Sequence, residues 1–198
     1  MIVPAACAKL MNESTPIPLA RLIVVTGRPG SGKTSLAKQL AQAIRCPAIC
    51  RDEMKEGWIH TTGQRAEPGD ESATKLYEAF FETVKLLLGY NVTLIAEAAF
   101  QHKLWAPKLE VLQPISRIRV IVCSVDPEIA RARCIDRGLT DPQRERFHPD
   151  PAIPAAREGR SLPLGVYEPP HLGVPTLSVD TSDGYRPDIQ AVASFAMG

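Results

Sequence analysis

A glycine-rich segment near the start of the chain contains the residue types best suited to binding phosphate. It satisfies the pattern GxxxxGK[ST] at every fixed position and reads Gly27-Arg28-Pro29-Gly30-Ser31-Gly32-Lys33-Thr34. Glycines permit backbone conformations and close approaches that a side chain would forbid, so successive main-chain N–H groups can turn toward a phosphate. Lys33 adds positive charge near the β- and γ-phosphates, and the Thr34 hydroxyl can ligate Mg²⁺. We therefore predict that this segment, with the adjacent Ser35, binds a nucleoside triphosphate and Mg²⁺.

The elements on either side of the glycine-rich segment suit this role. The apolar run Leu22 to Val25 is typical of a strand buried on both faces of a parallel sheet. Residues Lys33 to Ile44 place Leu36 and Leu40 on one stripe at helical spacing, which predicts a helix whose positive N-terminal end faces the phosphates. The dinucleotide-binding pattern GxGxxG is not present.

A second candidate site residue, Asp52, follows the short predicted strand Pro47 to Cys50. Ligands of parallel α/β proteins gather at the carboxyl ends of the strands, so Asp52 is expected beside the phosphates. A carboxylate there can accept the proton of an attacking hydroxyl or hold that hydroxyl in line with the γ-phosphate. The alternative is that Asp52 caps a helix beginning at Glu53, and the two roles are compatible.

Together with the phosphate-binding segment, the run Cys50-Arg51-Asp52-Glu53-Met54-Lys55 resembles the P-loop kinases that include polynucleotide kinases, zeta-toxin-like enzymes and antibiotic phosphotransferases. The resemblance covers about residues 21–183. It implies an ATP-dependent kinase in which Asp52 is the base and Arg51 lies near the substrate or the phosphates. Relatives often carry an aspartate after the third strand, where this chain has Glu97. We expect Glu97 to orient Mg²⁺ through water or to contact the substrate; the alternative is a structural hydrogen bond.

The resemblance also implies a lid that closes over the nucleotide. In the family, lid arginines stack on adenine and neutralise charge on the transferring phosphoryl group. Arginines cluster where such a lid would begin, at Arg131, Arg133, Arg137, Arg144 and Arg146. Arg133 and Arg137 lie four residues apart and so share a helix face. Arg133 is therefore expected to bind the nucleotide and Arg137 to take part in catalysis; the alternative is a solvated basic face.

The remaining segments predict a three-layer α/β/α sandwich around a five-stranded parallel sheet, the nucleotide-kinase-like P-loop NTPase fold with a mobile arginine-rich lid. The kinase domain is expected over residues 21–198, with the lid at about 127–170 and a leader over 1–20. The other expected strands are Asn91–Ala96, Ile118–Val125 and Val174–Val179. The other expected helices are Asp70–Leu88, His102–Leu112, Pro127 to about Arg137, and Pro187–Met197. Glu53–Gly69 is expected to be an irregular or partly helical insertion, and Asp141–Pro170 an irregular segment.

Composition narrows the function classes. A net charge of +1 provides no broad basic surface, so nucleic acid is not favoured as a partner. The cysteines are odd in number (five), which favours a reducing compartment over a disulfide framework. No secretory signal or membrane-spanning run is apparent, so we expect a cytoplasmic protein.

The sequence thus favours transfer of the γ-phosphate of Mg·ATP to a hydroxyl of a small molecule, such as a nucleoside, a sugar or an antibiotic-like compound. One alternative acceptor is the 5′-hydroxyl of a polynucleotide. Another alternative is a regulatory, nucleotide-dependent ATPase with no small acceptor. Adenine is expected from the resemblance alone, and the sequence specifies neither the acceptor nor the oligomeric state.

Overall fold

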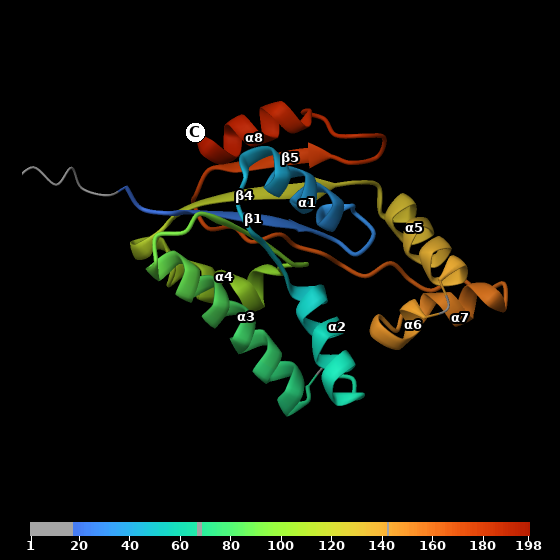
Figure 1. Cartoon of the computed structure of the whole chain (residues 1–198). Coiled ribbons are helices and arrows are strands. Elements are labelled where there is room, and N and C mark those ends of the chain that lie inside the picture. The colour runs from blue at the N-terminus through green and yellow to red at the C-terminus, as the bar shows by residue number, and fades with distance from the viewer. Residues whose placement is uncertain (1–17, 67–68, 142) are drawn as a thin grey trace, which may run out of the picture.

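The computed structural model describes residues 18–66, 69–141 and 143–198, so the first 17 residues of the expected leader lie outside the described residues. Five parallel strands form one sheet in the order β2-β3-β1-β4-β5 (Figure 1). Their bounds are β1 (Arg21–Gly27), β2 (Ala48–Cys50), β3 (Leu94–Glu97), β4 (Arg117–Ser124) and β5 (Thr176–Asp180). The predicted five-stranded parallel sheet is confirmed.

Helices cover both faces of this sheet (Figure 1). One face packs against α1 (Lys33–Ile44) and α8 (Ile189–Met197). The other packs against α3 (Glu71–Gly89), α4 (His102–Glu110) and the short 3-10 helix η1 (Gln113–Ile115). Successive strand side chains point to opposite faces, so Leu22 and Val24 join one core while Ile23 and Val25 join the other. Burial on both faces explains the continuous apolar run and confirms the three-layer sandwich.

Four further helices position the functional residues. Helix α2 (Arg51–Thr62) begins directly at the end of β2. Helices α5 (Pro127–Thr140), α6 (Arg144–Phe147) and α7 (Ala152–Arg157) lie together beyond the ends to which the strands point (Figure 1). The carboxylate of Asp126 caps α5 by accepting hydrogen bonds from the N–H groups of Glu128 (2.8 Å) and Ile129 (3.4 Å). Within the described ranges, no helix is long and apolar enough to cross a membrane.

Several predicted boundaries differ from the structure. The insertion over 53–69, expected to be irregular or partly helical, is helical up to Thr62 as part of α2, which buries only Ile59 and so lacks a hydrophobic stripe. The segment expected to be irregular over 141–170 contains α6 and α7, whose four and six residues are too few to show a periodic pattern. Strand β3 runs from Leu94 to Glu97, which makes Glu97 its last residue.

Candidate active site

The glycine-rich segment forms a tight loop between β1 and α1. Gly30 and Gly32 have φ angles of 82° and 78°, in the left-handed region that glycine adopts without strain. A Cβ atom on Gly30 would lie 2.0 Å from the carbonyl oxygen of Ala130 in α5. Only glycine can therefore bring the loop this close to α5, and the loop and the start of α5 must fit together.

The rear of the loop is held by the ends of two strands. Ser31 is fully buried, and its carbonyl oxygen accepts a hydrogen bond of 2.7 Å from the Thr181 hydroxyl. The Thr181 hydroxyl also lies 3.2 Å from the carbonyl oxygen of Ser124, at the end of β4. This contact fixes the loop against the sheet, with Ser31 on the side that faces away from the cavity described next.

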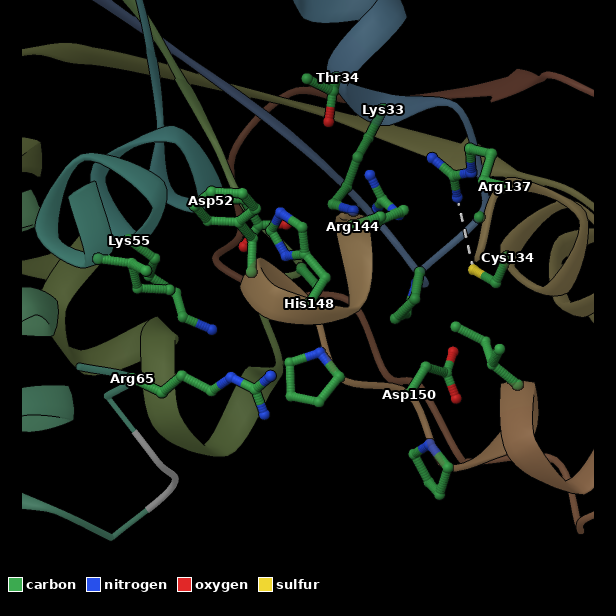
Figure 2. Close-up of a pocket in the computed structure, with 18 of the residues that line it drawn as sticks. Lys33, Thr34, Asp52, Lys55, Arg65, Cys134, Arg137, Arg144, His148 and Asp150 are labelled. Atoms are coloured by element: carbon green, nitrogen blue, oxygen red, sulfur yellow. Dashed lines mark hydrogen bonds between the residues drawn. The ribbon is translucent and has the colours of Figure 1, made fainter. Parts of the chain in front are cut away.

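A cavity of about 560 Å³ opens between the loop, α2 and the helices α5 to α7 (Figure 2). It brings together many of the predicted site residues: Pro29, Gly30, Gly32, Lys33, Thr34, Ser35, Asp52 and Arg137. Other predicted residues do not line it: Gly27, Arg28, Ser31, Arg51, Glu97 and Arg133. The phosphate-binding loop and the proposed base thus face one shared space.

Asp52 lies in the first turn of α2, half-buried, and lines the cavity with Lys33 and Thr34 (Figure 2). The helix begins at Arg51, and its N-cap residue is Cys50. The alternative in which Asp52 caps a helix starting at Glu53 is therefore wrong, because the helix starts two residues earlier. Its carboxylate is left free to act on a ligand in the cavity.

Glu97 lies beneath the loop and is 1% exposed. One carboxylate oxygen, Oε2, accepts a hydrogen bond of 3.2 Å from the Thr34 hydroxyl. The other, Oε1, lies 3.8 Å from Lys33 Nζ and has no hydrogen-bond partner among the described residues. Burial raises the pKa of Glu97, and the Lys33 ammonium opposes this shift. The structural hydrogen bond expected as the alternative role of Glu97 is thus present, and a buried oxygen remains without a partner.

The oxygen atoms of Thr34 and Glu97 fit a magnesium ion. Hydroxyl and carboxylate oxygens are hard ligands of the kind that Mg²⁺ prefers, and Mg²⁺ commonly binds through one or two carboxylates together with waters and substrate phosphates. In the part of the chain that the structure describes, no three His, Cys, Asp or Glu side chains form a metal-binding cluster. Binding of Mg²⁺ here would therefore depend on oxygens supplied by the nucleotide.

The buried carboxylate predicts a specific pH dependence of stability. The native pKa of Glu97 is above its ordinary value of 4.5, so the native protein holds this proton more tightly than the unfolded chain does. The contribution of the protonated Glu97 side chain to the free energy of unfolding is complete below about pH 4.5. It is lost as the pH rises through the native pKa of Glu97. The unfolding free energy of wild type should therefore fall relative to that of Glu97→Gln as the pH rises from about 4.5 through the native pKa of Glu97. Urea denaturation without nucleotide measures this difference, and parallel pH profiles would contradict it.

The three predicted lid arginines on α5 have different surroundings. The Arg131 guanidinium donates to the carbonyl oxygens of Leu162 and Pro163. Arg137 lines the cavity, and its Nε donates to the carbonyl oxygen of Arg133 at 3.0 Å. The Arg133 guanidinium instead donates to the carbonyl oxygens of Thr181 (3.0 Å) and Ser182 (2.7 Å), in the loop after β5. Arg144 of α6 also lines the cavity (Figure 2). Arg137 and Arg144 are thus the arginines of α5 and α6 placed to meet a phosphate in the cavity.

Hydrogen bonds at one side of the cavity join α2 and Arg65, which follows α2, to α6 and His148. Arg65 donates to the carbonyl oxygens of Arg146 (2.8 Å) and Glu145 (3.0 Å). His148 Nε2 lies 2.6 Å from a carboxylate oxygen of Glu56. We refer to these contacts as the α2–α6 bridge, and they join α2 and the residues that follow it to α6 and His148.

Sequence reasoning did not assign a role to several polar residues that line the cavity: Lys55, Arg65, His148 and Asp150. Lys55 follows Asp52 by three residues, and helical spacing places the two on one face. That signal was available once the helix was known to include Asp52. The others come from segments without a periodic pattern, so no spacing in the sequence indicated them.

Comparisons with known proteins identify a family for this chain and solved structures with a similar fold. A family profile described as an AAA domain matches residues 22–151. A proposed kinase from Chloroflexus aurantiacus J-10-fl is 25% identical, with a TM-score of 0.73 over 91% of this chain and 98% of that chain. The Mycobacterium tuberculosis APS kinase, solved with AMPPNP and APS, is 15% identical, with a TM-score of 0.63 over 92% and 100% of the two chains. A gluconokinase from Sinorhizobium meliloti 1021 is 17% identical, with a TM-score of 0.55 over 90% and 91%. No curated protein matched the chain significantly.

Proposed function

Since this chain belongs to the AAA domain family of P-loop kinase-like proteins, we propose that it transfers the γ-phosphoryl group of ATP to a hydroxyl group of a small molecule. The observation that carries this proposal is that Asp52 and the phosphate-binding loop line the same cavity of about 560 Å³. A proton acceptor beside a phosphate-binding loop is the arrangement that phosphoryl transfer to a hydroxyl requires.

In the proposed reaction, the residues of the chain mainly position groups and stabilise charge. The loop amides and Lys33 hold the β- and γ-phosphates, and Arg137 with Arg144 neutralises charge that develops on the transferring group. Asp52 orients the acceptor hydroxyl and takes its proton as the new oxygen–phosphorus bond forms. The bond from the γ-phosphorus to the bridging oxygen breaks, and ADP leaves.

Thr34 and, directly or through water, Glu97 would hold Mg²⁺, which would neutralise charge on the β- and γ-phosphate oxygens. The hydrogen bond between Thr34 and Glu97 keeps both oxygens on the same side of the loop. The Lys33 ammonium lies 3.8 Å from the other oxygen of the same carboxylate, Oε1. The buried Glu97 side chain therefore helps to position Lys33 as well.

The size of the cavity and the contacts across it support a small acceptor over a polynucleotide. The cavity has a volume of about 560 Å³, and the α2–α6 bridge connects its two sides through Arg65 and His148. The net charge of +1 also supports this choice, because nucleic-acid binding usually relies on an extended basic surface.

Acceptor-dependent phosphate transfer tests the proposal. The protein is incubated with [γ-³²P]ATP and Mg²⁺, together with nucleosides, sugars, hydroxy acids, sugar phosphates, antibiotics or a 5′-hydroxyl oligonucleotide. We expect labelled product with at least one small compound and faster ADP release in its presence. Labelling of the oligonucleotide alone, weakening steeply with salt, would instead indicate a polynucleotide kinase. Slow ADP release that no acceptor changes would contradict a kinase and favour a regulatory ATPase.

A further inference from the structure

A second, smaller hollow of about 160 Å³ adjoins the main cavity. It is lined by Arg51, Lys55, Ala66, Ala73 and Leu76. Lys55 and Ala66 also line the main cavity, so the two spaces are neighbours on the side of α2. In Figure 2, Asp52, Lys55 and Arg65 lie on one side of the main cavity, and Lys33, Arg137 and Arg144 lie near the loop on the other. The hollow therefore lies on the side where an acceptor would meet Asp52.

Arg51 and Lys55 are the two cations of this hollow, and the nearby Asp52 carboxylate favours the charged form of Arg51. No ion pair in the described part of the chain involves Arg51 or Lys55. The Nε atom of Arg51 is buried and has no hydrogen-bond partner among the described residues. The Arg51 guanidinium lies over the Trp105 ring, 5.5 Å from its centroid, so one flat face is covered while the donors at its edge stay available.

The partly buried charge of Arg51 is costly unless an anion offsets it. Burial lowers the pKa of Arg51, which reflects the loss of water around its charge. The remaining lining residues, Ala66, Ala73 and Leu76, have no side-chain atom that accepts a hydrogen bond. An arginine fork and a lysine ammonium beside apolar side chains are well suited to bind a phosphate or carboxylate group.

Helix α2 connects this hollow to the reacting centre. Arg51 and Asp52 are consecutive in its first turn, and Lys55 follows Asp52 at the i+3 position of the same helix. A molecule whose anionic group contacts Arg51 and Lys55 therefore has its remaining atoms next to the Asp52 carboxylate. The rigid helix would set the separation between the anionic group and the hydroxyl to be phosphorylated.

We infer, on the basis of the proposed function, that the acceptor is an anionic small molecule. Arg51 and Lys55 bind its phosphate or carboxylate group while Asp52 faces its hydroxyl. The positive charge of Arg65, which also lines the main cavity, adds to the attraction. A neutral acceptor would supply no anionic ligand to the donors of Arg51 and Lys55.

Calorimetry with a simple anion tests this inference separately from catalysis. Mg·AMP-PNP is first titrated into the protein to fill the donor site, and orthophosphate is then titrated into the saturated protein, with acetate in a parallel titration. We expect saturable binding of at least one of these anions, weakened at least tenfold by Lys55→Gln and by Arg51→Gln. Lys85→Gln, which removes an exposed lysine of α3, is the matched control and should bind like wild type. Comparing orthophosphate with acetate distinguishes a phosphate from a carboxylate acceptor.

Two outcomes would overturn the inference: no saturable binding of either anion to the AMP-PNP-loaded protein, or equal anion affinity in wild type and Lys55→Gln. Because Arg51 packs against Trp105, its variant is accompanied by a melting curve, and Lys55→Gln decides the matter if Arg51→Gln unfolds. Failure of AMP-PNP to bind would count against the proposed function instead. The anion titration on nucleotide-free wild type and Lys55→Gln would then still decide whether the anion site exists.

Discussion

Replacing Lys33 with alanine should abolish measurable turnover and weaken Mg·ATP binding by at least about a hundredfold. Lys33 is 8% exposed and is the lysine that the loop itself contributes to the cavity. In the proposed complex its ammonium would contact the phosphate oxygens of the nucleotide, and this interaction would strengthen as charge develops during transfer. We expect kcat/KM to fall by about 10³-fold or more, equivalent to about 4 kcal/mol of transition-state stabilisation.

Calorimetry with Mg·ATP and a steady-state ADP assay measure this effect. Lys38→Ala is the matched control, because Lys38 lies on the same helix but is exposed and forms only a surface ion pair with Glu53. The change at Lys33 also removes the cation that lies 3.8 Å from the buried Glu97 carboxylate, so a melting curve must show that the variant is folded. A folded variant with wild-type ATP affinity would mean that the loop does not bind the triphosphate as proposed.

Asp52→Asn should separate binding from transfer. Asparagine has nearly the same shape but cannot accept the proton of the hydroxyl, so phosphate transfer should slow by about 10² to 10⁴-fold. Affinity for Mg·ATP should change less than about threefold, since the phosphates are held by the loop and Lys33. Single-turnover transfer to the identified acceptor, with parallel calorimetry, gives both quantities.

The adjacent Glu53 provides a matched control for this experiment. Glu53→Gln removes a carboxylate from the same turn of α2, but Glu53 is exposed and does not line the cavity. It should therefore transfer phosphate at close to the wild-type rate. Undiminished transfer by Asp52→Asn across the pH range would remove the base assignment while leaving the nucleotide site intact.

Local features of the structure could be predicted from the sequence because they depend on neighbouring residues. The phosphate-binding loop combines special backbone conformations at Gly30 and Gly32 with a buried strand before it and an amphipathic helix after it. All of these leave a pattern within about twenty-five residues. The position of Asp52 followed from the rule that ligands gather at the carboxyl ends of parallel strands.

The opposite wall of the cavity could not be predicted in this way. Arg65 meets Glu145 and Arg146 across about eighty residues of sequence, and Glu56 meets His148 across ninety-two. Such contacts depend on tertiary packing and leave no period. Arg133 illustrates the same limit. It lies four residues before Arg137 and so was expected on the same helix face, but its guanidinium binds carbonyl groups of the loop after β5.

The α2–α6 bridge lies where it can control access to the space around Asp52. Arg65 and His148 join two segments that both line the space around Asp52. In the proposed kinase, breaking and re-forming these contacts would widen and narrow that space as an acceptor binds and its product leaves. When the contacts are formed, they would limit the access of water to the terminal phosphate of ATP.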